Sequence, residues 1–177
     1  MKIVKRILLA LGAIVILLVA IAYALPSRYR VVRSIDIDAP PSKIYPLVAN
    51  TRAWKQWSIW NRRDPNMAIV YSGPESGAGS QWKWQSRSEG AGEMTLTSAE
   101  PDRRIGYRLF FPDFNSTATG AIAFDPITPG TTRVTWTNEG ELGNNPMMRW
   151  MGLAMDQMVG NDFAAGLANL KALASSK

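Results

Sequence analysis

The N-terminal part of the chain holds its longest uninterrupted apolar run. Residues 7–25 contain nineteen consecutive positions without a charge, and twelve of these are Ile, Leu or Val. A helix of that length extends about 28 Å, which nearly matches the roughly 30 Å thickness of a bilayer's hydrocarbon core. The pattern therefore predicts a membrane-spanning helix over residues 7–25, ended by Pro26.

A cleaved signal peptide is the alternative for the same segment. Lys2, Lys5 and Arg6 form a basic start, and Ala22-Tyr23-Ala24 resembles a small-x-small cleavage site. The apolar run is longer than the usual core of about 7–15 residues in a signal peptide, which favours a retained anchor. A mature N-terminus near Leu25 would instead identify a signal peptide.

Basic residues flank the apolar run on both sides, so the positive-inside rule gives only a slight bias in orientation. We expect the commoner arrangement, in which a short N-terminal tail stays in the cytoplasm and the domain is exported. The sequence thus predicts a bacterial inner-membrane protein, with an anchor over residues 1–28 and a periplasmic domain over residues 29–177.

The pattern changes to alternation after the apolar run. From Tyr29 to Ile37 every second residue except Arg33 is apolar, which predicts a half-buried strand ending at Ala39-Pro40. A short helix is expected from Pro41, and a second one over residues 51–57 with Thr51 as its N-cap. Residues 58–66 are expected to form a loop.

Six more strands follow in close succession, each bounded by Gly, Pro or Asp. The alternation predicts them at residues 67–72, 80–86, 93–99, 104–111, 117–125 and 132–138. Turn signals at this regular spacing are typical of an antiparallel meander.

The last predicted element is a long helix. Asn145 is a suitable N-cap and Pro146 suits the first helical position. An apolar stripe that includes Met147, Met151 and Met155 follows at spacings of mostly three and four. Only this helix is long enough to cover the sheet, so we expect an α+β fold in which a curved sheet of about seven strands leaves an elongated apolar space beneath the helix.

Composition removes several kinds of chemistry. The chain has no Cys and no His, which excludes cysteine nucleophiles, Ser–His triads and the usual zinc and haem ligands. No cluster of metal ligands is visible, and the glycine-rich segment Gly77-Ala78-Gly79 lacks the context of a dinucleotide loop. We therefore expect no metal site, no cofactor and no assigned catalytic residue.

The net charge of +6 does not indicate a nucleic-acid partner. Four basic residues lie in or beside the first apolar segment, which leaves 16 basic against 14 acidic residues in the domain. Those 16 are dispersed among the acids, whereas phosphate binding needs a concentrated basic stripe. The sequence gives no indication of the oligomeric state.

The domain resembles the START-like SRPBCC superfamily, specifically its bacterial polyketide cyclase/dehydrase-like branch, over roughly residues 29–174. The resemblance implies a helix-grip fold, with a cavity that takes an apolar small molecule. It does not identify the ligand, because the superfamily includes lipid carriers, receptors, cyclases and regulators. The motifs that carry it are Asp38-Ala39-Pro40 and residues 43–48 (KIYPLV), 54–60 (WKQWSIW), 64–67 (DPNM), 71–74 (YSGP), 77–82 (GAGSQW), 132–136 (TRVTW), 158–163 (MVGNDF) and 166–171 (GLANLK).

Large apolar side chains expected to face the long helix are the candidate ligand contacts. Ligand pockets are mainly apolar, and Met adapts to irregular shapes, although the same residues could simply fill a core. The candidates are Trp57, Trp60, Trp82, Trp84, Tyr107, Leu109, Phe111, Trp136, Met151, Met155 and Met158.

Three tryptophans at spacings of three allow three interpretations. Trp54, Trp57 and Trp60 could form a gate at the cavity mouth, contact the bilayer interface where Trp is favoured, or pack a helix on the sheet.

Three functions remain open at this stage. The first is membrane-tethered binding or carriage of a small lipid-like or aromatic ligand. The second is a cyclase or dehydratase acting on a polyketide-like substrate, which would need polar residues to meet near the pocket. The third is a non-catalytic module that binds another protein. The polar residues for the second are Glu139, Asp156, Arg108, Arg149 and Tyr107.

Overall fold

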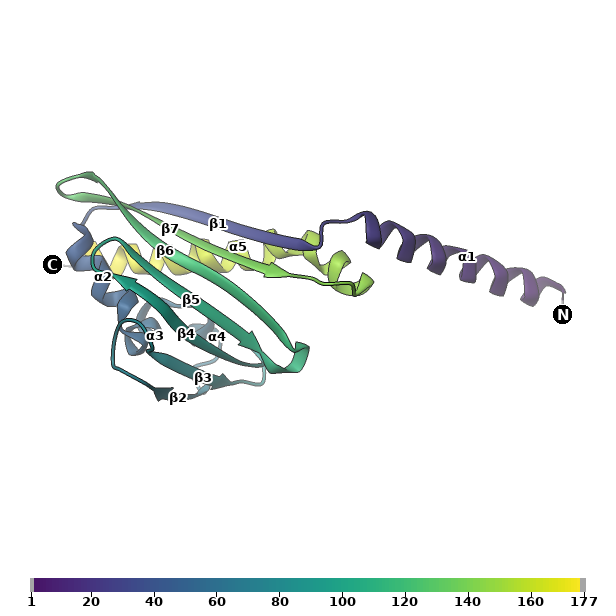
Figure 1. Ribbon diagram of the computed structural model, residues 1–177, viewed down its shortest axis with the longest axis horizontal. Coiled ribbons are helices and arrows are strands. Elements are labelled where there is room, and N and C mark those ends of the chain that lie inside the picture. The colour runs from purple at the N-terminus through teal and green to yellow at the C-terminus, as the bar shows by residue number, and fades with distance from the viewer. Residues whose placement is uncertain (1, 176–177) are drawn as a thin grey trace.

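All seven predicted strands are present in the computed structural model, which describes residues 2–175 (Figure 1). They form one antiparallel sheet in the order β1-β7-β6-β5-β4-β3-β2. The strands are β1 (Arg28–Ile37), β2 (Ala68–Ser72), β3 (Gln81–Gln85), β4 (Ala91–Glu100), β5 (Arg104–Phe111), β6 (Ser116–Thr128) and β7 (Thr131–Glu141).

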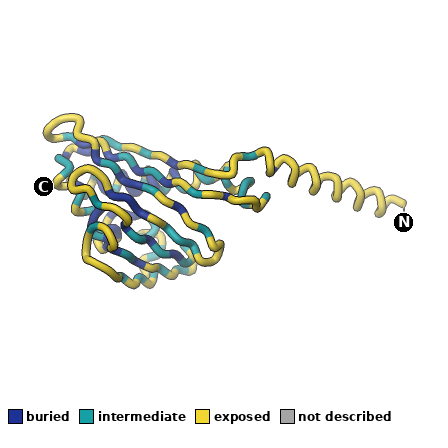
Figure 2. Tube along the Cα trace, in the orientation of Figure 1, coloured by how far each residue is buried: buried dark blue, intermediate teal, exposed yellow. Residues whose placement is uncertain are grey.

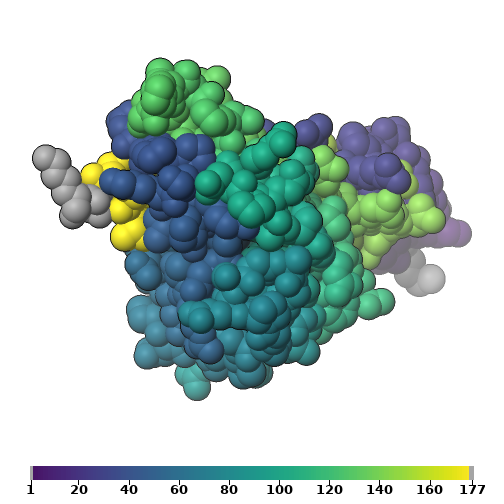
Figure 3. Space-filling view, turned by 60° about the vertical axis from the view of Figure 1, so that its left-hand side comes forward, coloured from purple at the N-terminus to yellow at the C-terminus, as the bar shows by residue number. Residues whose placement is uncertain are grey.

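The helices lie in three places: before β1, between β1 and β2, and after β7. They are α1 (Lys2–Ala24), α2 (Pro41–Ala49), α3 (Trp54–Trp57), α4 (Ile59–Arg63) and α5 (Pro146–Ser175), with short 3-10 turns η1 (Thr51–Ala53) and η2 (Pro112–Phe114). The sheet curves over α5, and α2 lies beside the β6–β7 hairpin at the end of the domain away from α1 (Figures 1 and 3). The α+β helix-grip architecture is confirmed.

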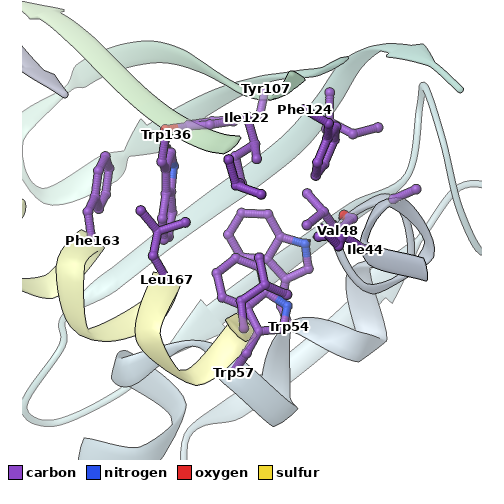
Figure 4. Close-up of a cluster of buried hydrophobic side chains, with 14 of the residues drawn as sticks. Ile44, Val48, Trp54, Trp57, Tyr107, Ile122, Phe124, Trp136, Phe163 and Leu167 are labelled. Carbon is purple, nitrogen blue, oxygen red and sulfur yellow. Dashed lines mark hydrogen bonds between the residues drawn. The ribbon is translucent and has the colours of Figure 1, made fainter. Parts of the chain in front are cut away.

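Aromatic stacking holds α5 against the sheet. The Trp136 indole on β7 and the Phe163 ring on α5 lie 3.9 Å apart and 5° from parallel. Trp54 and Trp57 meet the other side of Trp136 edge-on, at 5.6 and 5.4 Å (Figure 4). Such aromatic contacts contribute about 0.5–1.5 kcal/mol each beyond the area that they bury. This cluster is the centre of the core, which Figure 2 shows as the buried middle of the sheet.

Glycines let α5 approach the sheet closely. A Cβ at Gly160 would lie 2.1 Å from the Arg33 guanidinium, and a Cβ at Gly166 would lie 3.1 Å from the Trp136 ring. A side chain at position 160 would therefore displace the Arg33 guanidinium, and one at position 166 would require the Trp136 ring to shift. Glycine lowers the intrinsic stability of the helix, and the close packing of α5 on the sheet offsets this cost.

The start of α5 is as predicted. The Asn145 side-chain oxygen accepts a hydrogen bond of 2.9 Å from the Met147 amide, with Pro146 at the first helical position.

The short helices before β2 differ in two details from the sequence prediction. Asn50 caps the first turn instead of Thr51, because its side-chain oxygen accepts from the Arg52 amide at 2.8 Å. Residues 59–63, expected as a loop, form α4 after a break at Ser58, whose backbone is extended. A segment of five residues is too short for hydrophobic periodicity to distinguish a single helical turn from a loop.

The N-terminal helix α1 projects from the domain at the end where β1 and α5 begin (Figure 1). Within Lys2–Ala24 only Ala22 is buried. The helix has 23 residues, and its most apolar 18-residue stretch has a mean hydropathy of 2.9. By length and composition it could cross a membrane, and a signal sequence would have the same properties.

A buried tyrosine connects the core strands. The Tyr107 hydroxyl donates to the Thr137 carbonyl at 2.8 Å and accepts from the Trp136 indole N–H at 2.9 Å and the Asn138 amide at 3.3 Å. Burial raises the pKa of Tyr107 well above its usual value, so the hydroxyl stays protonated and donates at neutral pH.

We expect Tyr107→Phe to lower the free energy of unfolding by about 1–3 kcal/mol, because it leaves two buried N–H donors without their acceptor. Tyr71→Phe is the matched control: Tyr71 is half-buried, and its hydroxyl makes no side-chain hydrogen bond within residues 2–175. Urea denaturation of both variants measures the difference. Equal stabilities would show that the Tyr107 hydroxyl contributes nothing.

Candidate ligand cavity

A cavity of about 240 Å³ lies between the first half of α5, α4 and the concave side of the sheet. Most of its wall is apolar. Its lining residues are Tyr29, Ser58, Trp60, Asn61, Met67, Trp82, Trp84, Glu89, Met94, Leu109, Phe111, Asn138, Met155, Val159, Asp162 and Phe163. The residues further along α5, Leu167 and Leu170, are fully buried and pack solidly, so the space is confined to one end of the helix–sheet layer.

A cross-strand pair shapes the wall on β3 and β4. Trp84 is directly opposite Gly92, and a Cβ on Gly92 would lie 2.2 Å from the Trp84 indole. The indole therefore lies flat over the β4 backbone and meets the Phe111 ring edge-on at 6.0 Å. Because Gly92 has no side chain, the indole occupies the wall and leaves the cavity open.

A hydrogen-bonded chain of polar groups borders the cavity on the β1–β7 side. The Tyr29 hydroxyl donates to the Asn138 side-chain oxygen at 3.0 Å, and the Asn138 amide donates onward to Tyr107. Burial raises the pKa of Tyr29, so this phenol is protonated at neutral pH. Sequence reasoning missed both Tyr29 and Asn138. The available signal was the parity of β7, which puts Asn138 on the same face as Trp136.

An ion-paired cluster borders the cavity at α4. The Arg63 guanidinium contacts the Asp162 carboxylate on α5 at 2.8 Å and the Glu89 carboxylate between β3 and β4 at 3.0 Å. The Trp60 indole N–H donates to Asp162 at 2.9 Å. The hydrogen bond that Arg63 donates to Asp162 is the main cause that raises the pKa of Arg63. The cluster joins three elements that are distant in sequence and holds α4 over the cavity.

Six of the predicted ligand contacts line this cavity: Trp60, Trp82, Trp84, Leu109, Phe111 and Met155. Three others, Trp57, Tyr107 and Trp136, lie outside the lining and are almost fully buried in the core. The last two, Met151 and Met158, point away from the sheet and are 42% and 62% exposed. Spacings of three and four cover more than one face of a helix this long, so the stripe divides into inward and outward methionines.

The tryptophans of the 54–60 segment also divide. Trp54 and Trp57 are core residues whose indole N–H groups donate to the carbonyls of Val48 and Leu47 at 2.8 and 3.0 Å. They pack α3 on the sheet and have no surface with which to contact a bilayer. Trp60 is half-buried and lines the cavity.

The five polar residues considered for catalysis do not meet in the cavity. Glu139 faces the opposite side of the sheet and pairs with Arg30 at 3.0 Å. Asp156 pairs with Arg33 at 2.9 Å, and this hydrogen bond is the main cause that lowers the pKa of the carboxyl. Tyr107 is saturated by its three hydrogen bonds. Arg108 is exposed, and Arg149 binds backbone carbonyls near the start of α5.

Polar groups inside the domain already have partners. Among residues 2–175, no buried side-chain nitrogen or oxygen lacks a hydrogen bond. The same part of the chain has no group of three or more carboxylates placed to hold a metal ion. The cavity therefore offers a ligand mainly shape and apolar contact.

Residues 28–175 match the family model described as polyketide cyclase / dehydrase and lipid transport. The match covers nearly the whole chain after α1. No curated protein sequence matches the chain significantly.

Solved structures resemble the domain in fold. A protein of Chromobacterium violaceum has 18% identity and a TM-score of 0.59, covering 86% of this chain and 100% of its own. A protein of Thermobifida fusca has 19% identity and a TM-score of 0.62, covering 82% and 92%. Truncated norcoclaurine synthase of Thalictrum flavum has 9% identity and a TM-score of 0.64, covering 85% and 95%. At these identities the likeness extends to the fold alone.

We expect Gly92→Ala to close part of the cavity, because the new methyl group must displace the Trp84 indole. Gly130→Ala is the control, since a Cβ at Gly130 meets no atom within 4 Å. The quenching of tryptophan fluorescence by 1-naphthol measures the result, with weaker binding expected for Gly92→Ala only. Unchanged binding in both variants would show that Trp84 does not shape the site.

Proposed function

The chain belongs to the polyketide cyclase/dehydrase and lipid transport family of the SRPBCC superfamily, and we propose that it binds and carries a small apolar ligand beside a membrane. The observation that carries this proposal is the apolar cavity between α5 and the sheet, which the packed core leaves open at one end only. The family membership supports either a ligand-binding or a cyclase role, and the cavity's composition favours binding.

The volume of the cavity limits the ligand. An engineered apolar cavity of about 150 Å³ in another protein takes up benzene. The cavity here, at about 240 Å³, accommodates an aromatic molecule of one or two rings or a short acyl chain. It is smaller than the roughly 300–1,000 Å³ of pockets for drug-sized ligands, and a two-chain lipid would require α4 to move away.

The polar border would orient the ligand. Asn138 uses one amide hydrogen toward Tyr107, and the Tyr29 oxygen keeps lone pairs after donating to Asn138. A ligand with one hydroxyl or carbonyl group next to its apolar body could be satisfied here. We therefore propose a phenol, a small aromatic ketone or a short-chain acid or alcohol as the class of ligand.

Tethering through α1 is the second part of the proposal. The exposed apolar surface of α1 and its separation from the core support an anchor over residues 7–25, with the division into residues 1–28 and 29–177 and the domain on the periplasmic side of a bacterial inner membrane. A tether keeps the cavity next to the bilayer in which apolar molecules accumulate, so that capture is local.

Filling the cavity tests the binding proposal. Leu109→Trp places an indole where the cavity now lies, and we expect affinity for 1-naphthol to fall at least tenfold, which corresponds to about 1.4 kcal/mol. Val70→Trp adds the same bulk on β2, where the side chain is 67% exposed, and should bind like the unmodified protein.

Native mass spectrometry of the gently purified protein provides the second measurement. We expect a co-purified small molecule in the unmodified protein and in Val70→Trp, and its loss in Leu109→Trp. The proposal is wrong if the unmodified protein carries no ligand and binds neither 1-naphthol nor other small aromatic probes.

A further inference from the structure

The outward face of the first half of α5 is mostly apolar and exposed, with Gln157 as the polar side chain among its residues. Met147 is 72% exposed, Leu153 59% and Met158 62%, and Trp150 and Met151 lie between them at 37% and 42%. These residues, called here the outer face of α5, lie on the side of the helix that points away from the sheet.

The outer face carries no charge. The two charged residues between Pro146 and Gly160 are Arg149 and Asp156, and both point elsewhere. Arg149 donates to the carbonyls of Gly143 and Leu25, and Asp156 pairs with Arg33 of β1. A water-facing helix usually places charge on its outer side, so this distribution is the reverse of what solvent favours.

The outer face begins beside α1. The Trp150 indole N–H donates to the Leu18 carbonyl at 3.3 Å, and Arg149 donates to the Tyr23 carbonyl at 3.0 Å. The Arg149 guanidinium also lies over the Tyr23 ring, 5.4 Å from its centre. The first turns of α5 therefore pack against the last turns of α1, and the apolar surfaces of the two helices are continuous.

This contact determines the depth of the outer face, given the proposed tether. Leu18 lies six residues before the end of α1 at Ala24, which is about 9 Å along the helix axis. The interfacial layer on each side of the hydrocarbon core is only about 5–8 Å thick. Because the proposed anchor ends at Leu25, the Trp150 indole is held on the membrane side of that end, beside the apolar part of the span, and Met147 is on the turn next to it.

A second exposed aromatic lies at the same end of the domain. Phe114 in η2 is 66% exposed and follows β5, whose last residue pairs with the start of β6. The start of β6, the end of β7 and the start of β1 adjoin one another through the strand register, so Phe114 is on the side from which α1 leaves (Figure 1).

We propose that the outer face of α5, together with Phe114, is a bilayer-contact surface that rests on the lipid interface beside α1. The inference rests on the proposed tether and specifies which surface of the domain faces the membrane. Met155 and Val159, which line the cavity, are on the neighbouring face of the same helix. The contact therefore places one wall of the cavity next to lipid, where an apolar ligand enters or leaves without crossing bulk water.

The absence of Cys makes a single-label experiment straightforward, because any introduced Cys is unique in the chain. We choose Met151→Cys on the outer face, Leu11→Cys in the middle of α1, and Ile127→Cys as the control. Ile127 is 48% exposed and lies in the β6–β7 hairpin, at the end away from α1 (Figure 3). The full chain is labelled with a nitrobenzoxadiazole dye and reconstituted in phosphatidylcholine–phosphatidylglycerol vesicles that carry spin-labelled lipids.

We expect the Met151 label to shift to the blue on reconstitution and to lose most of its emission to a quencher near the lipid headgroups. The Leu11 label should be quenched by a spin label deep in the acyl chains, and the Ile127 label by neither. Leu153→Cys, a second position on the outer face, should repeat the Met151 result, and far-ultraviolet circular dichroism checks that each labelled variant is folded.

The possible results separate the two proposals. Quenching at Leu11 with a Met151 label that behaves like the Ile127 label would overturn the contact surface and keep the tether. An unquenched Leu11 label would overturn the tether and the contact surface together. Neither result bears on whether the cavity binds 1-naphthol, which Leu109→Trp tests separately.

Discussion

The stacking of Phe163 on Trp136 is the contact on which the rest of the domain depends. It fixes α5 to β7 near the middle of the helix, and the full burial of Leu167 and Leu170 extends this contact to the C-terminal half. The first half of α5 instead borders the cavity, whose opposite wall is formed by side chains of β3, β4 and β5. One end of the same helix thus serves stability and the other leaves room for a ligand.

The open end is maintained by contacts that do not fill it. Gly92 lets the Trp84 indole lie flat against β4, and Arg63 holds α4 to α5 through Asp162. An unsupported cavity in a protein tends to collapse, because the atoms that line it lose dispersion contacts that a closely packed core would provide. Rigid indoles and a charge-paired α4 are the features that resist this collapse.

The sequence predicted the layout of this fold well and the detail of its site only in part. Strand limits and the start of α5 follow from local signals, namely alternation, turn residues and the Asn145–Pro146 cap, which tertiary packing does not override here. The resemblance to the family was confirmed over residues 28–175. Six of eleven proposed ligand contacts lie in the cavity, because the parity of a strand determines which side chains share a face.

The errors arise where periodicity is ambiguous or partners are distant in sequence. Met151 and Met158 satisfy the same helical spacing as Met155 yet point outward, since a stripe at spacings of three and four is wider than one face. The Arg63–Asp162 pair joins residues that are 99 positions apart, and no local pattern announces such a contact. Tyr29 and Asn138 were overlooked because each stands among aliphatic or charged neighbours with stronger signals.

The join between α1 and the domain limits how the proposed carrier would deliver its ligand. Only three residues separate Ala24 from Arg28, a stretch of about 10 Å at most. Hydrogen bonds also hold these three residues to the domain: the Leu142 amide donates to the Ser27 carbonyl at 2.8 Å, and the Arg149 side chain donates to the Leu25 carbonyl at 3.3 Å. A linker this short and hydrogen-bonded does not let the domain rotate away from α1 to reach a distant acceptor. If α1 is inserted in a membrane, the protein would carry its ligand by lateral diffusion within one bilayer. Any acceptor would then have to bind the protein at the surface of that bilayer.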